Sequence, residues 1–454
     1  MPRPAKALGA AGRGGEGLLV LGIETSCDDT GAAVIELGGR GAVVLGEAKV
    51  SQAELHNPWG GVVPTLAADA HQQQIDAVVA AALLQAGISE DPSRLSAIAV
   101  TAGPGLSACL QVGVDAAEAL SARYGVPVIP IHHMEAHALV VRMQAGDIPG
   151  EPHVKFPFLC CLLSGGHTLL LVAHGVGRYT QLGTTCDDAL GEAYDKVARI
   201  LGLHVGGGGG PILEKLARLG DPLAHAFTVP MRQQQNCNFS FAGLKTAVRL
   251  TVERELPGIK QVSGGEPVAA AGLDVYGSDE EAQKAADIAA SFQHVATTHL
   301  KDRIRRAHAW AMEVEPSIEH LVLAGGVASN TYVRGEIEAL CCTGQQEPLE
   351  KRGKKGPLGL LLACPPPALC VDNGAMVAWA GLERLRALEG GGRGDGQELE
   401  PPSASAPVEV YPRWPLSAAH HDRASGMNLH SVRKPKGTPP PGVDAVCVPR
   451  GGAK

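Results

Sequence analysis

The chain has 454 residues, a formal net charge of −8, 45% hydrophobic residues and a mean hydropathy of +0.04. This length allows two or three domains of roughly 100–200 residues each, and the composition is typical of a soluble globular protein. No apolar run reaches the roughly 18 residues that a membrane-spanning helix needs. The acidic balance gives no general attraction for nucleic acid, so an RNA partner would have to be met by a local patch.

The N-terminal stretch 1–17 carries Arg3, Lys6 and Arg13 against a single acid, Glu16. It is too polar for a secretory signal and is weakly similar to an organellar transit peptide, although it is short and contains no serine. We expect a disordered tail, with a role in targeting as the alternative.

Two successive series of elements follow. In the first, apolar runs predict strands at 18–23, 32–37, 96–100 and 126–131, and helical patterns lie near 70–86 and 107–123. In the second, strands are predicted at 157–163, 169–174, 321–324 and 358–363, with helices near 188–201, 240–253, 283–312 and 374–388. Each series opens with a strand, a glycine-bearing turn and a strand, and the alternation that follows is typical of α/β layers. We therefore predict two related α/β lobes.

The predicted boundaries place the first lobe at 18–155 and the second at 156–416. Three segments without periodicity look like inserts, near 256–282, 344–357 and 390–407. Residues 417–454 are basic and proline-bearing, and we expect them to be disordered.

The segment His133-Met134-Glu135-Ala136-His137 sets two imidazoles four residues apart. On a helix they share one face and can hold one divalent cation. A zinc protease needs a carboxylate directly after its first histidine, whereas Glu135 lies about 200° round the helix from either His. Taken alone, the pattern is also compatible with a solvated helix that carries two incidental histidines.

Eight motifs occur along the chain in a specific order. They are GIETSCDDTG (22–31), TAGPGL (101–106), HHMEAH (132–137), LLSGGHT (162–168), DDALGEAYDK (187–196), FSFAGLKT (239–246), AGGVASN (324–330) and VDNGAM (371–376). In this order and at these separations they resemble the tRNA N6-adenosine threonylcarbamoyltransferase family, formerly called glycoproteases. YPRWPL (411–416) and LLSGGHT look like the bacterial and organellar branch.

The resemblance implies a two-lobed fold of the actin and sugar-kinase superfamily with the ligand in the cleft. It implies transfer of a threonylcarbamoyl group from threonylcarbamoyl-adenylate to N6 of the adenosine 3′ to the anticodon. The tRNAs concerned read codons that begin with A, and AMP is released. One divalent metal cation is implied, with iron and zinc as the expected metals. A homodimer and helper proteins of the same pathway are left open as partners, and no membrane is expected.

The resemblance also assigns roles to residues. His133, His137 and Asp372 match the metal ligands. The substrate-binding positions are Leu162, Leu163, Ser164, Gly165 and Gly166 under the adenylate phosphate, and Asp195, Gly210, Glu214 and Asn330 around the nucleoside. The five-glycine run before Pro211 departs from the family pattern, so Gly210 could be displaced by two positions.

Some of these residues have simpler explanations. Asp195 could be a surface carboxylate, Asn330 a helix cap and Asp372 a complement to a helix dipole. Asp28, in the first turn, has the chemistry to orient or deprotonate the N6 amine, although an Asp in such a turn is often only an Asx-turn residue.

Three other functions compete with the transferase. An ATPase or sugar kinase of the same superfamily would have no use for the two histidines, and a metalloprotease lacks its base. A catalytically idle scaffold would be expected to have lost the metal residues. The bacterial-type motifs, the inserts and the basic N-terminal stretch favour a mitochondrial protein, with a plastid or the cytoplasm as alternatives.

Overall fold

The computed structural model describes residues 17–39, 41–56, 59, 61–144, 153–203, 208–259, 275–341, 357–389 and 407–416. Residues 1–16 of the predicted N-terminal tail, the tail 417–454 and most of the three predicted inserts lie outside these ranges, so those expectations stay predictions. In the described part of the chain, no helix is long and apolar enough to cross a membrane.

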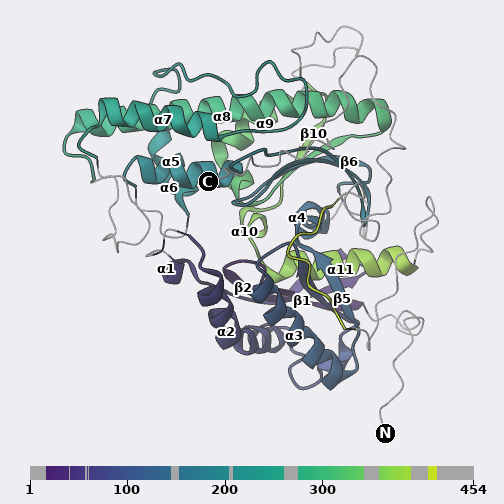
Figure 1. The fold of residues 1–454 in the computed structure, drawn as a ribbon. Helices are drawn as coiled ribbons and strands as arrows, with labels where there is room; N and C mark the ends of the chain where they lie inside the picture. The colour runs from purple at the N-terminus through teal and green to yellow at the C-terminus, as the bar shows by residue number, and fades with distance from the viewer. Residues whose placement is uncertain are drawn as a thin grey trace, which may run out of the picture.

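Two mixed five-stranded sheets form the framework (Figure 1). The first contains β1 (Leu18–Glu24), β2 (Asp29–Gly38), β3 (Gly41–Ser51), β4 (Ala97–Gly103) and β5 (Val128–His132). The second contains β6 (Phe158–Leu163), β7 (Thr168–Gly175), β8 (Arg178–Thr184), β9 (His320–Ala324) and β10 (Leu361–Ala363). The eight predicted strands are all present, and β3 and β8, which are more polar, are additions.

The two sheets share one topology. The first has the order β3-β2-β1-β4-β5, and the second, read from its other edge, has β8-β7-β6-β9-β10. The opening strand of the first sheet, β1, pairs antiparallel with β2 and parallel with β4. The opening strand of the second sheet, β6, likewise pairs antiparallel with β7 and parallel with β9. This repeated order confirms the prediction of two related α/β lobes.

Helices cover the sheets. They are α1 (Ala53–His56), α2 (Pro64–Gln85), α3 (Ser107–Tyr124), α4 (His133–Leu139), α5 (Leu190–Ile200), α6 (Gly209–Ala217), α7 (Ala242–Glu255), α8 (Asp279–Val314), α9 (Thr331–Cys341), α10 (Pro367–Cys370) and α11 (Gly374–Glu389). Helices α2 and α3 pack on one face of the first sheet, and α11 packs on its other face. Helices α5 to α9 cover one face of the second sheet.

Helix α4 lies between the two lobes, as Figure 1 shows. All seven of its residues are buried. Ala136 and Leu139 pack into the core beneath the first sheet, whereas Met134 and Ala138 pack against the second sheet. The helix is apolar on two opposite sides because it fills the space between two sheets, and its histidines are held at that junction.

The predicted boundary at 155/156 assigns residues 374–388 to the second lobe, yet α11 packs on the first sheet. The backbones of α11 and β1 lie close together because Gly374 and Gly22 meet at their contact. A Cβ atom on Gly22 of β1 would lie 2.2 Å from the carbonyl oxygen of Gly374, and one on Gly374 would lie 2.4 Å from the backbone of Ala32. The chain therefore returns to the first lobe immediately after Asp372.

Candidate metal and nucleotide site

The end of β5 sets the start of α4. His132 is the N-cap of the helix, and its Nδ1 accepts a hydrogen bond from the Met134 N–H at 3.1 Å. Its Nε2 donates to the carbonyl oxygen of Trp414 at 2.7 Å. Burial lowers the pKa of His132 to about 3, which keeps the ring neutral and able to make both contacts.

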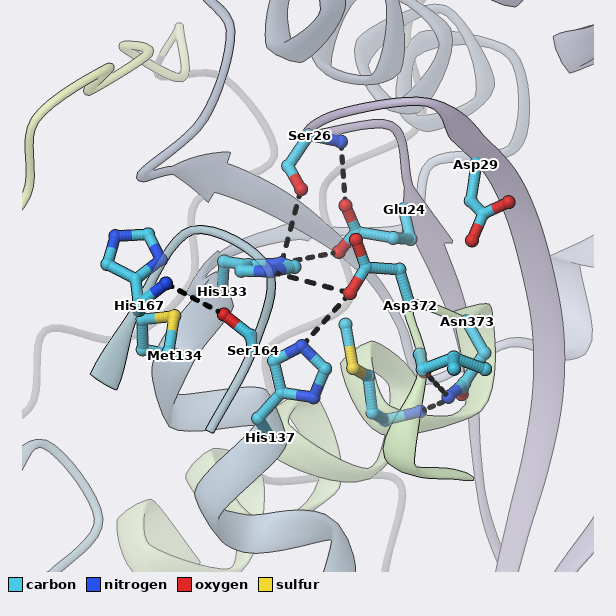
Figure 2. Close-up of polar contacts among 12 residues, drawn as sticks. Glu24, Ser26, Asp29, His133, Met134, His137, Ser164, His167, Asp372 and Asn373 are labelled. Carbon is cyan, nitrogen blue, oxygen red and sulfur yellow. Dashed lines mark hydrogen bonds and ion pairs between the residues drawn. The ribbon is translucent and has the colours of Figure 1, made fainter. Parts of the chain in front are cut away.

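His133 is oriented by a buried carboxylate. Its Nδ1 lies 3.2 Å from Oε2 of Glu24, the last residue of β1, and 3.2 Å from Oγ of Ser26 (Figure 2). Glu24 is itself held by the Ser26 N–H at 2.6 Å and the Thr101 hydroxyl at 2.6 Å. A carboxylate on one ring nitrogen fixes the tautomer and leaves Nε2 as a metal ligand.

Asp372 reaches the histidines from the loop that precedes α11. The next residue, Asn373, caps that helix by accepting a hydrogen bond from the Met376 N–H at 2.8 Å. Lys49 of β3 donates to the main-chain oxygen of Asp372 at 2.8 Å and pairs with Asp29 at 2.6 Å. The loop is thus fixed on both sides of the carboxylate.

The three predicted ligands converge, with ligand atoms within 4.8 Å of one another. Oδ1 of Asp372 is 3.0 Å from Nε2 of His137 and 3.6 Å from Nε2 of His133. Tetrahedral bonds of ~2.0–2.1 Å to zinc would place such atoms ~3.3 Å apart. The two distances from Asp372 bracket this value, so the residues fit a divalent ion once the widest pair of ligand atoms closes from 4.8 Å. His137 has no carboxylate behind it, since its Nδ1 is buried without a partner among the described residues.

The site favours positive charge. Burial would lower the pKa of His133, but the Glu24 and Asp372 carboxylates raise it to about 9. Burial likewise opposes ionisation of Asp372, yet His133 and His137 hold the pKa of that carboxyl well below its usual value. Two carboxylates around two imidazoles form a setting in which a cation is stabilised.

The glycine turn between β6 and β7 faces this group. Leu162 and Leu163 are the buried end of β6, and the turn closes through a hydrogen bond from the Ser164 N–H to the His167 carbonyl oxygen at 2.8 Å. Burial, together with His133 and His137 nearby, lowers the pKa of His167 to about 4. Added Cβ atoms on Gly165 and Gly166 would meet nothing within 4 Å, so this backbone is open to a ligand.

The predicted nucleoside residues gather around α6. Asp195 of α5 accepts a hydrogen bond from the Gly209 N–H at 2.6 Å, at the start of α6, where Gly210 also lies. Glu214 of α6 accepts from the Thr331 N–H at 3.0 Å, and Asn330 caps α9 by accepting from the Val333 N–H at 3.0 Å. The side-chain oxygen of Asn330 is therefore the helix cap that the simpler explanation expected. Its side-chain nitrogen donates to Gln293 at 3.0 Å.

Asp28 is half-buried in the turn between β1 and β2. Its main-chain oxygen accepts a hydrogen bond from the Gln52 N–H at 2.9 Å. Among the described residues, no hydrogen bond or ion pair joins its carboxylate to His133, His137 or Asp372.

Glu135 points away from the metal residues. Its carboxylate accepts from the Gly177 N–H at 2.6 Å and the Tyr179 hydroxyl at 3.1 Å, and it pairs with Arg384 at 2.8 Å. The carboxylate is fully engaged in joining α4 to both lobes. It cannot act as the base of a protease.

Sequence reasoning missed the residues that support the site. Glu24 and Thr101 lie at the ends of buried strands, and Lys49 lies on an edge strand. An acid that closes the apolar run LLVLGIE was the available signal for Glu24, because a buried carboxylate needs a partner.

Comparison with known proteins identifies the family of the chain. The family model described as tRNA N6-adenosine threonylcarbamoyltransferase matches residues 43–379. An Arabidopsis thaliana protein named "Probable tRNA N6-adenosine threonylcarbamoyltransferase, mitochondrial" is 48% identical over 423 residues, which cover 92% of this chain and 79% of that protein. A Chelativorans sp. (strain BNC1) protein named "tRNA N6-adenosine threonylcarbamoyltransferase" is 42% identical over 400 residues, 87% of this chain and 94% of that one.

Among solved structures, the ethanolamine utilization protein EutJ from Carboxydothermus hydrogenoformans has 12% sequence identity and a TM-score of 0.33, with 84% of this chain and 91% of that chain covered. The matches to the family model and to the two sequence relatives extend over most of the chain, and the family-model range 43–379 spans His133, His137 and Asp372. The chain is a member of the tRNA N6-adenosine threonylcarbamoyltransferase family.

Proposed function

We propose that the chain transfers the threonylcarbamoyl group from L-threonylcarbamoyladenylate to N6 of the adenosine 3′ to the anticodon, in tRNAs that read codons beginning with A. The observation that carries this proposal is the convergence of His133, His137 and Asp372 beside the open glycine turn at 164–166. An ATPase or sugar kinase would have no use for this imidazole pair.

The reaction needs an activated donor because the lone pair of the N6 amine is delocalised into the adenine ring. The amine attacks the carbamoyl carbon, the bond from that carbon to the phosphate oxygen breaks, and AMP leaves with the electron pair. The N6 proton is taken up by a base. The chain's task is to hold two nucleosides in line and to stabilise negative charge on oxygen.

The backbone N–H groups of Gly165 and Gly166 suit the phosphate, since glycine has no Cβ to keep it away, and Ser164 closes the turn that presents them. Leu162 and Leu163 hold the turn in place as the end of β6. A zinc or iron ion on His133, His137 and Asp372 would act as a Lewis acid toward a phosphate or carbonyl oxygen. Metal analysis of the purified protein distinguishes the two metals.

For the nucleoside of the donor we assign Asp195, Gly210, Glu214 and Asn330. Their grouping around α6 supports this assignment. The glycine turn at 164–166 lies close by, because the Gly191 N–H of α5 donates to the Ser164 oxygen at 3.3 Å. We assign Asp28 the role of orienting or deprotonating the N6 amine, because its carboxylate is half-buried in the turn that follows Glu24.

The partners follow from the reaction: tRNA and the adenylate, with a homodimer or helper proteins as further partners. We place the protein in the mitochondrion, supported by the basic N-terminal stretch and by the name of the Arabidopsis relative. Fusing residues 1–40 to a fluorescent reporter tests this placement. Mitochondrial signal is expected, and diffuse cytosolic or plastid signal would contradict it.

The activity is tested with purified protein, synthetic adenylate donor and a tRNA that reads an A-starting codon. Nucleoside mass spectrometry should detect threonylcarbamoyladenosine, formed in step with AMP. The variant carrying both His133→Ala and His137→Ala should lose the product. ATP hydrolysis over many turnovers without tRNA, or product formation by that variant at the wild-type rate, would contradict the proposal.

A further inference from the structure

The segment 407–416, here called the C-terminal strap, runs along the first sheet and ends at α4. Figure 1 shows it in yellow beside β5 and α4. Its main chain is fixed at three points on the first lobe. The Val408 N–H donates to Glu118 at 2.7 Å, the Tyr411 N–H donates to the Ala102 oxygen at 2.7 Å, and the Gly105 N–H donates to the Pro412 oxygen at 3.3 Å.

The strap is docked too closely to be a loose tail. A Cβ atom on Gly103, at the end of β4, would lie 2.0 Å from the carbonyl oxygen of Tyr411. The rings of Tyr411 and Trp414 are 5.0 Å apart, and Trp414 also lies 4.9 Å from the ring of His132. Leu416 is only 6% exposed, in the core that contains Met134 and Ala138 of α4.

His132 joins the strap to the metal helix through both of its ring nitrogens. Nε2 donates its proton to the Trp414 carbonyl oxygen at 2.7 Å. A neutral imidazole carries one proton, so Nδ1 is left as an acceptor. It accepts the Met134 N–H at 3.1 Å and so caps the helix at the residue before His133. The Trp414 bond and the helix cap therefore both need the tautomer that carries its proton on Nε2.

We infer that His132 and the C-terminal strap are positioning elements for the metal ligands, a role that rests on the proposed metal site. Helix α4 has only seven residues, and both of its ligands lie within five of them. Its first turn thus sets the position of His133 directly. Outer groups that orient metal ligands usually contribute 10–100-fold in metal affinity.

Two substitutions separate the two contacts of His132. In His132→Asn, the amide oxygen replaces Nδ1 as the helix cap, but the side chain is too short to reach the Trp414 oxygen. In His132→Gln, the amide nitrogen replaces Nε2 toward Trp414, but the cap is lost. His132→Ala loses both. The matched control is His174→Asn, because both His174 nitrogens are also bonded, to Glu315 at 2.8 Å and Thr180 at 3.0 Å, away from the metal residues.

The measurement is Zn²⁺ affinity of the full chain by competition with a chelator, together with the visible absorption spectrum of the Co²⁺ form. Wild type should bind one ion, and His132→Asn and His132→Gln should each bind roughly 10-fold more weakly or worse. Leu416→Ala, which loosens the strap and leaves His132 intact, should also weaken binding and alter the Co²⁺ spectrum. The His174→Asn control should match wild type.

Wild-type affinity in His132→Asn would overturn the inference, since it would mean that the cap alone suffices. Wild-type affinity in Leu416→Ala would overturn the role of the strap even if one His132 variant failed to fold. If wild type itself bound no metal, the proposed metal site would fail, and this outcome is distinct from the other two.

Discussion

At the scale of single residues, the site depends on buried carboxylates that face in different directions. Glu24 orients His133, a proposed metal ligand, whereas Glu135, two residues after His133 in the same motif, joins α4 to Gly177, Tyr179 and Arg384. Their opposite roles lead to two contrasting predictions.

Replacing Glu24 with glutamine should weaken Zn²⁺ binding by roughly 10–100-fold, because the amide cannot accept from His133, Ser26 and Thr101 together. The matched control is Glu383→Gln, another buried glutamate, which pairs with Arg142 at 3.0 Å. That control should lower stability and leave Zn²⁺ affinity unchanged. Equal Zn²⁺ affinity in Glu24→Gln and wild type would show that Glu24 does not orient His133.

Replacing Glu135 with glutamine should act on stability: a loss of about 3–5 kcal/mol of unfolding free energy is expected, because Arg384 loses its buried charged partner. Burial opposes ionisation of Glu135, but Arg384 leaves its pKa lowered from 4.5. The contribution of Glu135 is therefore fully present above pH 4.5 and is lost as the pH falls through the lowered folded-state value. Urea titrations across this range should show a pH dependence in wild type that is weaker in the variant. Identical acid profiles would contradict this account.

At the scale of elements, α11 fixes the loop that carries Asp372 to the first lobe. It begins at Gly374, two residues after Asp372, and rests on the first sheet through Gly22 and Gly374. A helix held by backbone contact transmits any displacement to the residue that precedes it. The position of Asp372 therefore depends on Gly22 of β1, which lets α11 lie close to the first sheet.

Gly22→Ala should destabilise the protein and weaken Zn²⁺ binding, because its Cβ would lie 2.3 Å from the Ala378 nitrogen and push α11 away. Gly335→Ala in α9 is the control. A Cβ there meets nothing within 4 Å, and alanine stabilises a helix by roughly 0.5–1 kcal/mol relative to glycine. Thermal melting and chelator competition measure the two effects. An unchanged melting temperature and Zn²⁺ affinity in Gly22→Ala would contradict the close contact.

Sequence patterns predicted most strands and long helices here, because apolar periodicity records which face of an element is buried. The spacing of His133 and His137 indicated a cation site, and the resemblance to the family added Asp372. Sequence patterns could not place α11 on the first sheet, because an apolar helix face does not say which sheet it covers. Glu24 and Lys49 were missed for a related reason: their roles arise from contacts between segments far apart in the chain.

At the scale of the whole molecule, the repeated strand order gives an architecture of two related α/β lobes. The distinctive feature of this chain is what fills the junction between the lobes. Helix α4 brings two imidazoles, the loop before α11 brings a carboxylate, and the second lobe brings a glycine turn. A site assembled from both lobes can respond to movement of either one.

The central claim is that these three side chains hold one divalent ion at the junction of the lobes. The most direct test is anomalous X-ray diffraction from crystals of the zinc- or iron-loaded protein, recorded at the absorption edge of the metal. We predict one strong peak per chain, ~2.0–2.2 Å from Nε2 of His133, Nε2 of His137 and a carboxylate oxygen of Asp372. A peak held by other residues, or no peak in protein that contains stoichiometric metal, would contradict the account.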